Sequence, residues 1–123
     1  MAKKILIIDD ELLVQKVLTD KLQEQGFEII SALDGEEGLK MIENKKPDLI
    51  LLDIIMPKLD GTSVLKKLKE NPETNRIPVL IFTNLSDKET LAISLKFGGV
   101  EYLTKADHTL DDIVEKVKEK LGP

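Results

Sequence analysis

The sequence predicts an α/β domain built on a five-stranded parallel sheet. Short apolar runs alternate with segments of helical periodicity, and the runs lie at 5–8, 28–30, 49–52, 79–82 and 100–103. The first, third and fourth runs contain only apolar residues, which is typical of central strands buried on both faces. The runs begin about 20 to 30 residues apart, the length of a right-handed βαβ crossover.

Each run is followed by a segment whose apolar residues recur at helical spacing. The apolar faces of the five expected helices are formed by Val14, Val17, Leu18 and Leu22; by Leu39 and Ile42; by Val64, Leu65 and Leu68; by Leu91, Ala92 and Leu95; and by Leu110, Ile113, Val114, Val117 and Leu121. Capping residues predict where the second and fourth helices begin: Asp34 with Glu37, and Ser86 with Glu89. Residues that disfavour a helix are expected to end these segments: Gly26, Pro47, Asn71-Pro72, Gly98-Gly99 and Gly122.

Five strand–helix units predict a three-layer sandwich with helices on both faces of the sheet. The number of strands suits the flavodoxin-like order 2-1-3-4-5, although periodicity alone does not fix that order. No linker, low-complexity segment or repeat interrupts residues 1–123, so we expect a single domain.

Composition excludes several classes of protein. The chain contains no cysteine, which excludes a disulfide scaffold, a thiolate metal site and a cysteine nucleophile, and its single histidine, His108, excludes a histidine-rich metal site. A net charge of −5 argues against direct binding of nucleic acid or of an anionic membrane surface. The apolar runs are too short to span a membrane, and the first residues do not resemble a signal peptide. The expected location is therefore cytoplasmic.

Polar side chains follow four of the expected strands. Asp9 and Asp10 come after the first strand, Asp53 after the third, Thr83 ends the fourth, and Lys105 lies two residues beyond the fifth. Because the carboxyl ends of parallel strands share one edge of the sheet, we expect these groups to converge beside the point where the strand order reverses.

The converging groups predict a site for a divalent cation and a phosphoryl group. Three neighbouring carboxylates repel one another, and a cation relieves that repulsion. Oxygen ligands without histidine or cysteine favour a hard ion, Mg²⁺ before Zn²⁺. Thr83 and Lys105 would donate to the oxygens of a transferring phosphoryl group. Asp53, in the middle of the set, can act as the nucleophile that forms an aspartyl phosphate.

Together these motifs resemble the receiver domain of bacterial two-component response regulators, over essentially the whole chain. The residues that carry the resemblance are the acid pair Asp9-Asp10, Asp53 with Met56-Pro57 and Asp60-Gly61 after it, the hydroxyl residue Thr83, the aromatic Tyr102 and the lysine Lys105.

The resemblance implies a phosphorylation-dependent signalling switch. A histidine kinase or a phosphotransfer protein would supply phosphate from a phosphohistidine, and Asp53 would accept it. Mg²⁺ would be bound by Asp10, Asp53 and the backbone carbonyl of Ile55, with Asp9 helping directly or through water.

The resemblance also implies how phosphorylation would change the surface of the domain. Thr83 and Lys105 would engage the phosphoryl oxygens, Tyr102 would turn inward, and the face of the fourth helix, fifth strand and fifth helix would change its preference for a downstream effector domain or protein. A phosphorylation-dependent homodimer through that face is a further expectation. Such a domain is not a conventional enzyme, because it modifies itself while assisting its own phosphorylation and dephosphorylation.

Two positions depart from the family pattern. The family usually has proline after its lysine, often across a cis bond, whereas Ala106 follows Lys105 here. A cis bond before a non-proline residue costs about 2.5–4 kcal/mol, so the loop is either strained or trans with a different shape. Asn84 stands where the family usually has a smaller residue, and its side chain is expected to crowd the phosphoryl site and slow attack by water.

Simpler interpretations exist for single residues. Asp9 or Asp10 could cap the first helix. Asp53 and Lys105 could be solvated surface groups, Thr83 an ordinary strand end, and Tyr102 a half-buried edge residue. His108 is expected to be a surface residue near a helix start. Leu12 and Leu13 either pack under a loop or form a docking patch for a kinase.

Three other functions compete with the switch. A haloacid-dehalogenase-type phosphatase would need an acid two residues after its nucleophile, where this chain has Ile55. A flavin carrier would need a phosphate-binding loop after the first strand, where Asp9-Asp10 would repel phosphate. A non-phosphorylated interaction domain of the same fold is disfavoured by the complete acid, threonine and lysine set, although Ala106 leaves it open.

Overall fold

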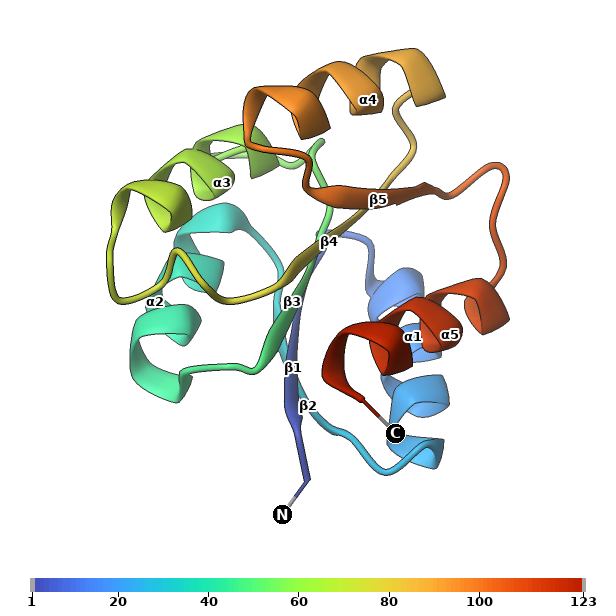
Figure 1. Ribbon diagram of the computed structural model, residues 1–123. Coiled ribbons are helices and arrows are strands. Elements are labelled where there is room, and N and C mark those ends of the chain that lie inside the picture. The colour runs from blue at the N-terminus through green and yellow to red at the C-terminus, as the bar shows by residue number, and fades with distance from the viewer. Residues whose placement is uncertain (1, 123) are drawn as a thin grey trace.

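The computed structural model describes residues 2–122. Its ten elements are β1 (Lys4–Ile8), α1 (Leu12–Glu24), β2 (Glu28–Ala32), α2 (Gly35–Lys45), β3 (Leu49–Leu52), α3 (Gly61–Glu70), β4 (Val79–Thr83), α4 (Asp87–Lys96), β5 (Glu101–Thr104) and α5 (Leu110–Leu121). The strands pair in parallel in the order β2-β1-β3-β4-β5 (Figure 1). The predicted fold class and strand order are therefore confirmed.

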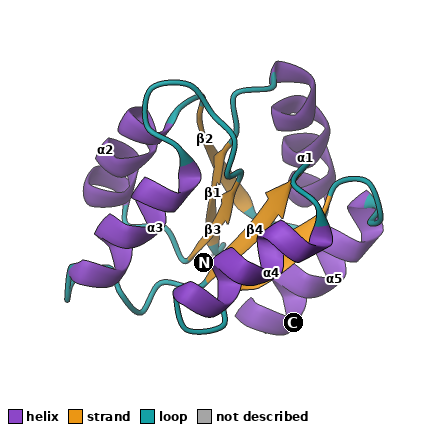
Figure 2. Cartoon of the chain, turned by 90° about the horizontal axis from the view of Figure 1, so that it is seen from above, coloured by secondary structure: helices purple, strands orange, loops and turns teal. Residues whose placement is uncertain are grey.

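Two hydrophobic clusters join the helices to opposite faces of the sheet. One cluster joins α1 and α5 to the face that carries Ile5, Ile7 and Leu51. The other joins α2, α3 and α4 to the face that carries Leu6 and Ile8. Figure 2 shows α2 and α3 on one side of the strands and α1 and α5 on the other. Both faces are covered, which explains why the central strands are continuous apolar runs.

Strand register brings the ends of β1, β3 and β4 to one edge of the sheet. Ile8 lies opposite Leu52, and Leu52 lies opposite Ile81. The backbone pairing continues one residue further, because the amide of Asp53 donates to the carbonyl of Ile8 at 3.0 Å. The two aspartates that follow β1 and β3 therefore emerge side by side.

Gly61 allows the first turn of α3 to lie directly against the end of β3. A Cβ atom at this position would lie 2.3 Å from the carbonyl oxygen of Asp53 and 2.6 Å from the Cα of Ile54. The amide of Gly61 donates to the carbonyl of Ile54 at 2.8 Å. A glycine is thus needed for the close approach that holds the backbone beside Asp53.

The buried face predicted for α4 is wrong. Leu91 and Leu95 are 43% and 66% exposed, and Ala92 is also exposed, whereas Thr90 and Ser94 are buried. Both inward hydroxyls have backbone partners: Thr90 donates to the carbonyl of Ser86, and Ser94 to that of Val100. Satisfied hydroxyls can occupy a core position at little cost, which leaves the apolar side of α4 open to solvent.

The face predicted for α1 needs a smaller correction. Val17 lies at the margin with 36% exposure, while Gln15 is buried. The helix begins at Leu12 after Glu11 and has no side-chain cap, so the interpretation of Asp9 or Asp10 as its cap is wrong. The caps predicted at Asp34 and Ser86 are confirmed. Within residues 2–122, none of the helices is both long and apolar enough to cross a membrane.

Candidate phosphoryl and metal site

The predicted site residues converge at the carboxyl edge of the sheet. Asp9 and Asp53 follow the neighbouring strands β1 and β3, and their carboxylates are almost completely buried. Thr83 ends β4 and is inaccessible to solvent. Lys105 follows β5 across a short extension of the sheet, in which its amide donates to the carbonyl of Thr83 at 2.8 Å. The strand order thus places an acid, an acid, a hydroxyl and an ammonium group in sequence along one edge.

Three carboxylates form a cluster that can hold a cation. Asp9, Asp10 and Asp53 each offer an oxygen, and these three atoms lie within 4.8 Å of one another. Asp10 is exposed, so the cluster opens to solvent on its side. An open set of oxygen ligands fits Mg²⁺, which binds one or two carboxylates and keeps several waters.

Lys105 lies over this cluster and contacts several acids at once. Its Nζ atom is 2.8 Å from Asp9 Oδ2, 3.4 Å from Asp53 Oδ2 and 3.0 Å from Glu11 Oε1. Its Nζ atom also lies over the ring of Phe82, 5.6 Å from the ring centroid. The backbone of residues 2–122 contains no cis peptide bond, so the Lys105-Ala106 bond is trans. The loop without proline therefore still delivers the lysine to Asp53.

Burial sets the protonation balance of the cluster. It raises the pKa values of Asp9 and Asp53, and the Lys105 ammonium offsets only part of this effect. Burial alone would lower the pKa of Lys105, but the hydrogen bonds to Asp9 and Glu11 and the charges of Asp53 and Asp9 together outweigh burial and raise that pKa. Ionised carboxylates at this edge are consequently held at a cost in free energy, which a bound cation would relieve.

Thr83 and Tyr102 occupy different surroundings. The Thr83 hydroxyl accepts a hydrogen bond from the amide of Leu85 at 3.3 Å, and it also lowers the pKa of Asp53. Tyr102 is half-buried against the core, and its hydroxyl donates to Asp87 Oδ1 at 3.0 Å. Burial raises the pKa of Tyr102, and the Asp87 carboxylate raises it further. Tyr102 thus occupies an edge position, tied to the first turn of α4.

Four other positions were named from the sequence. Ile55 donates its amide to Asp53 Oδ1 at 3.3 Å, and its side chain is exposed. Leu12 and Leu13 are 71% and 74% exposed, so the interpretation of them as packing under a loop is wrong. His108 lies just before α5, where its Nδ1 atom is 3.2 Å from the amide nitrogen of Thr104. Its side chain is half-buried near the start of α5.

Glu11 is a site residue that the sequence reasoning missed. Its carboxylate shares the Lys105 ammonium with Asp9, at 3.0 Å. The available signal was the third consecutive acid after Asp9-Asp10, but an acid in this place was equally consistent with the beginning of a helix.

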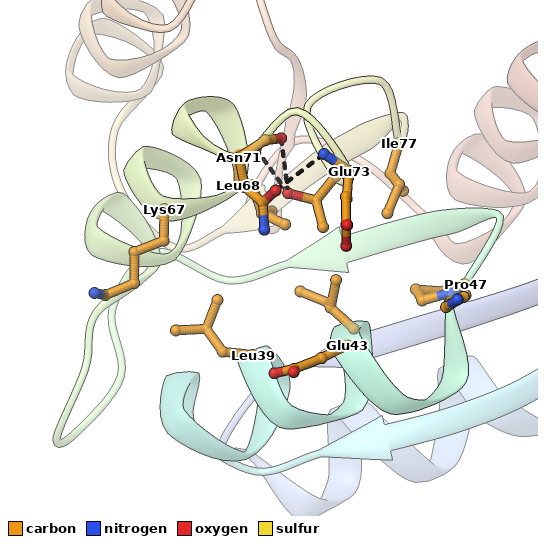
Figure 3. A pocket seen from close by; sticks show the side chains of 11 residues that line it. Leu39, Glu43, Pro47, Lys67, Leu68, Asn71, Glu73 and Ile77 are labelled. Carbon is orange, nitrogen blue, oxygen red and sulfur yellow. Dashed lines mark hydrogen bonds between the residues drawn. The ribbon is translucent and has the colours of Figure 1, made fainter.

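The site is separate from a hollow elsewhere on the surface. A cavity of about 620 Å³ lies between α2 and α3, lined by Leu39, Ile42, Glu43, Lys46, Pro47, Lys67, Leu68, Asn71, Glu73, Thr74 and Ile77 (Figure 3). Polar groups on one wall are already paired: Thr74 donates to the carbonyl of Leu68 at 2.9 Å, and the amide of Glu73 donates to Asn71. The cavity contains none of the predicted site residues.

Replacing Asp53 by asparagine is expected to stabilise the metal-free protein at neutral pH. The pKa of Asp53 is raised by folding, so ionisation of this carboxyl opposes folding once the pH exceeds its ordinary value of 3.8. Lys105 keeps its contacts with Asp9 and Glu11 in the variant. The free energy of unfolding should rise by about 1 kcal/mol at pH 7. This gain should shrink as the pH falls toward 3.8.

Urea unfolding in EDTA at several pH values measures this difference. Asp20→Asn is the matched control, because Asp20 is 60% exposed and its pairing with Lys16 contributes little to stability. A loss of stability in Asp53→Asn at neutral pH, or a gain that grows toward acid pH, would contradict the account of the buried carboxylates.

Comparison with known proteins gives one family. The sequence model of the response regulator receiver domain matches residues 5–118. The transcriptional regulatory protein PhoP of alkaline phosphatase synthesis in Bacillus subtilis is 41% identical over 105 residues, which cover 85% of this chain and 43% of PhoP. Response regulator PleD of Caulobacter vibrioides is 37% identical over 114 residues, which cover 93% of this chain and 24% of PleD. The chain thus spans less than half the length of these relatives.

Solved structures give the same result for the fold. The receiver domain of Francisella response regulator 1452 superposes with a TM-score of 0.86 at 33% identity, and covers 96% of this chain and 95% of its own. A two-component response regulator from Clostridium difficile gives a TM-score of 0.86 at 33% identity, covering 97% and 95%. With the acid edge, the lysine and the strand order in place, the chain belongs to the response regulator receiver domain family, whose members are phosphorylation-dependent signalling switches.

Proposed function

We propose that Asp53 accepts a phosphoryl group from the phosphohistidine of a histidine kinase or phosphotransfer protein, in a Mg²⁺-dependent reaction. The observation that carries the proposal is the cluster of three carboxylates within 4.8 Å of one another, with the Lys105 ammonium over it. Asp53 is the member that follows the central strand β3, between the acid pair on one side and Thr83 on the other.

The residues that would hold Mg²⁺ are Asp10, Asp53 and the backbone carbonyl of Ile55, with Asp9 helping directly or through water. When bound, the ion supplies positive charge that offsets the carboxylates and the developing charge on the phosphoryl oxygens. The raised pKa values of Asp9 and Asp53 support this assignment, because they mark carboxylates whose charge the protein alone compensates poorly.

The chemical step is a displacement at phosphorus. An Asp53 carboxylate oxygen forms the new P–O bond while the P–N bond to the donor imidazole breaks, and the electron pair of that bond returns to the imidazole nitrogen. The Lys105 ammonium and the Thr83 hydroxyl would then donate to the phosphoryl oxygens. Lys105 would have to leave part of its contact with Asp9 and Glu11 to do so.

The change at Asp53 would be transmitted through Thr83 and Tyr102 to the α4-β5-α5 face. Tyr102 has a polar link to break, since its hydroxyl donates to Asp87 at the start of α4. The exposed Leu91 and Leu95 give this face an apolar surface for a downstream effector domain or protein, or for a second copy of the chain in a phosphorylation-dependent homodimer. The domain would act in the cytoplasm, where a histidine kinase obtains its phosphate from ATP.

Leu12 and Leu13 would form the docking patch for the phosphodonor. They begin α1 directly after the acid pair and expose most of their side chains, although apolar groups in helices usually pack inward. A donor seated on them would bring its phosphohistidine to the open side of the carboxylate cluster.

Phosphorylation should occur at Asp53 and require a divalent cation. Incubation with acetyl phosphate and Mg²⁺ should raise the intact mass by one phosphoryl group, and EDTA or Asp53→Asn should abolish the gain. Asp20→Asn, an exposed control on α1, should retain it. An adduct that survives in Asp53→Asn would contradict the assignment, and no adduct with any donor would favour a non-phosphorylated interaction domain.

Leu12→Arg should slow phosphotransfer from a protein donor without affecting the chemistry. Loss of an apolar docking contact is expected to reduce the rate from a phosphorylated histidine kinase by roughly tenfold, while the rate with acetyl phosphate stays unchanged. The rate from protein donors is measured with a panel of radiolabelled histidine kinases, by quenching the reaction at successive times and detecting the label by autoradiography. The rate with acetyl phosphate is measured by intact mass. Leu95→Arg, an equally exposed site on α4, is the control. Equal rates for wild type and Leu12→Arg with the most active kinase would exclude the docking patch.

A further inference from the structure

Gln15 is a buried polar residue that the site described above does not use. It lies on α1, its exposed fraction is 6%, and it points at the ends of β1 and β2. Its Nε2 atom lies 2.9 Å from the carbonyl oxygen of Ile7, 3.1 Å from that of Asp9 and 2.8 Å from that of Ala32. One side-chain amide thus joins three backbone carbonyls from two strands.

The hydrogen bonds of Gln15 are not ideal for core stability alone. The amide has two hydrogens for three carbonyls, so the three bonds share their donors. Its Oε1 atom is buried and has no hydrogen-bond partner within residues 2–122. A buried acceptor without a partner is unfavourable, so the unpaired Oε1 offsets part of what the bonds to the three carbonyls contribute to stability.

The contacts of Gln15 instead determine where the acid pair points. The carbonyl of Asp9 belongs to the planar peptide that joins Asp9 to Asp10, so holding this oxygen fixes the orientation of both residues. On its other side, Asp9 donates its amide to the carbonyl of Ala32 at 3.1 Å, and Gln15 binds that same carbonyl. Gln15 therefore contacts the Asp9 carbonyl directly and also the carbonyl that accepts from the Asp9 amide.

We infer that Gln15 is a positioning residue for the cation site. It orients the Asp9-Asp10 peptide so that both carboxylates face Asp53, and its own side chain does not contact the ion. This inference rests on the proposed function, since it assigns Gln15 to the Mg²⁺ site formed by Asp9, Asp10 and Asp53.

Substitution by an apolar residue of similar length tests the inference. Gln15→Met and Gln15→Leu remove the donors, and Gln23→Met is the matched control on the exposed side of the same helix. Three measurements are made on each variant: the thermal midpoint in EDTA, the Mg²⁺ dissociation constant by titration calorimetry, and amide hydrogen exchange by NMR without metal.

Loss of positioning should weaken cation binding while the protein stays folded. The Mg²⁺ dissociation constant should rise roughly tenfold in both Gln15 variants, and each variant should keep a cooperative thermal transition. In the metal-free protein, the amide of Asp9 should exchange faster by roughly tenfold, while amides of β4 stay protected.

The remaining outcomes overturn the inference in distinguishable ways. Unchanged Mg²⁺ affinity in a folded Gln15 variant would refute it alone. Loss of the fold in both variants, or equal acceleration of exchange in β4, would make Gln15 a structural residue. Failure of the wild type to bind Mg²⁺ would refute the cation site of the proposed function and this inference with it, even if the Asp9 amide exchanged faster.

Discussion

The structure of the site depends on placing two buried carboxylates next to each other. Asp9 and Asp53 follow adjacent parallel strands, and the sheet register leaves no freedom to separate them. Their pKa values are raised by burial despite the Lys105 ammonium 2.8 Å from one and 3.4 Å from the other. The domain therefore keeps negative charge in a place where it is costly, and an added cation would relieve that cost. Cation binding and phosphoryl transfer at this edge would both depend on the close placement of these two carboxylates.

The rest of the fold maintains this arrangement. Gly61 brings α3 against the backbone of Asp53, and the extension of β5 along β4 carries Lys105 to the carboxylates. Gln15 reaches from α1 to the ends of β1 and β2. Each contact acts on a backbone segment at the carboxyl edge. The sheet therefore determines where the side chains of the loops lie. The loop after β1 supplies the exposed Asp10, and the first turn of α1 supplies the exposed Leu12 and Leu13.

Much of this architecture was predictable from the sequence because two strong signals agree. Unbroken apolar runs such as 49–52 mark strands covered on both faces, and polar residues directly after them mark the functional edge. Asp9, Asp10, Asp53 and Lys105 were found in this way, and the structure brings them together. The match of the family model to residues 5–118 supports the same interpretation.

The errors arose where side-chain hydrogen bonds overrode hydropathy. Thr90 and Ser94 pack inward because the carbonyls of Ser86 and Val100 accept their protons, so α4 exposes its leucines. Gln15 is buried for a similar reason, with three carbonyls within reach. Such partners come from segments distant in the chain or from the turn before the helix, and no periodicity in one helix reveals them. The trans geometry of the bond after Lys105 could not be predicted from the sequence either, because it depends on the conformation of the whole loop.

Anomalous diffraction from crystals grown with Mn²⁺, which prefers the same oxygen ligands as Mg²⁺, shows whether Asp9, Asp10 and Asp53 bind a divalent cation. We expect an anomalous peak at the carboxyl edge of the sheet, within roughly 2.0–2.3 Å of oxygens from Asp10 and Asp53. The absence of a peak at this edge in saturating Mn²⁺ would contradict the cation site. So would an ion bound elsewhere, with Lys105 alone compensating the charge of the carboxylates.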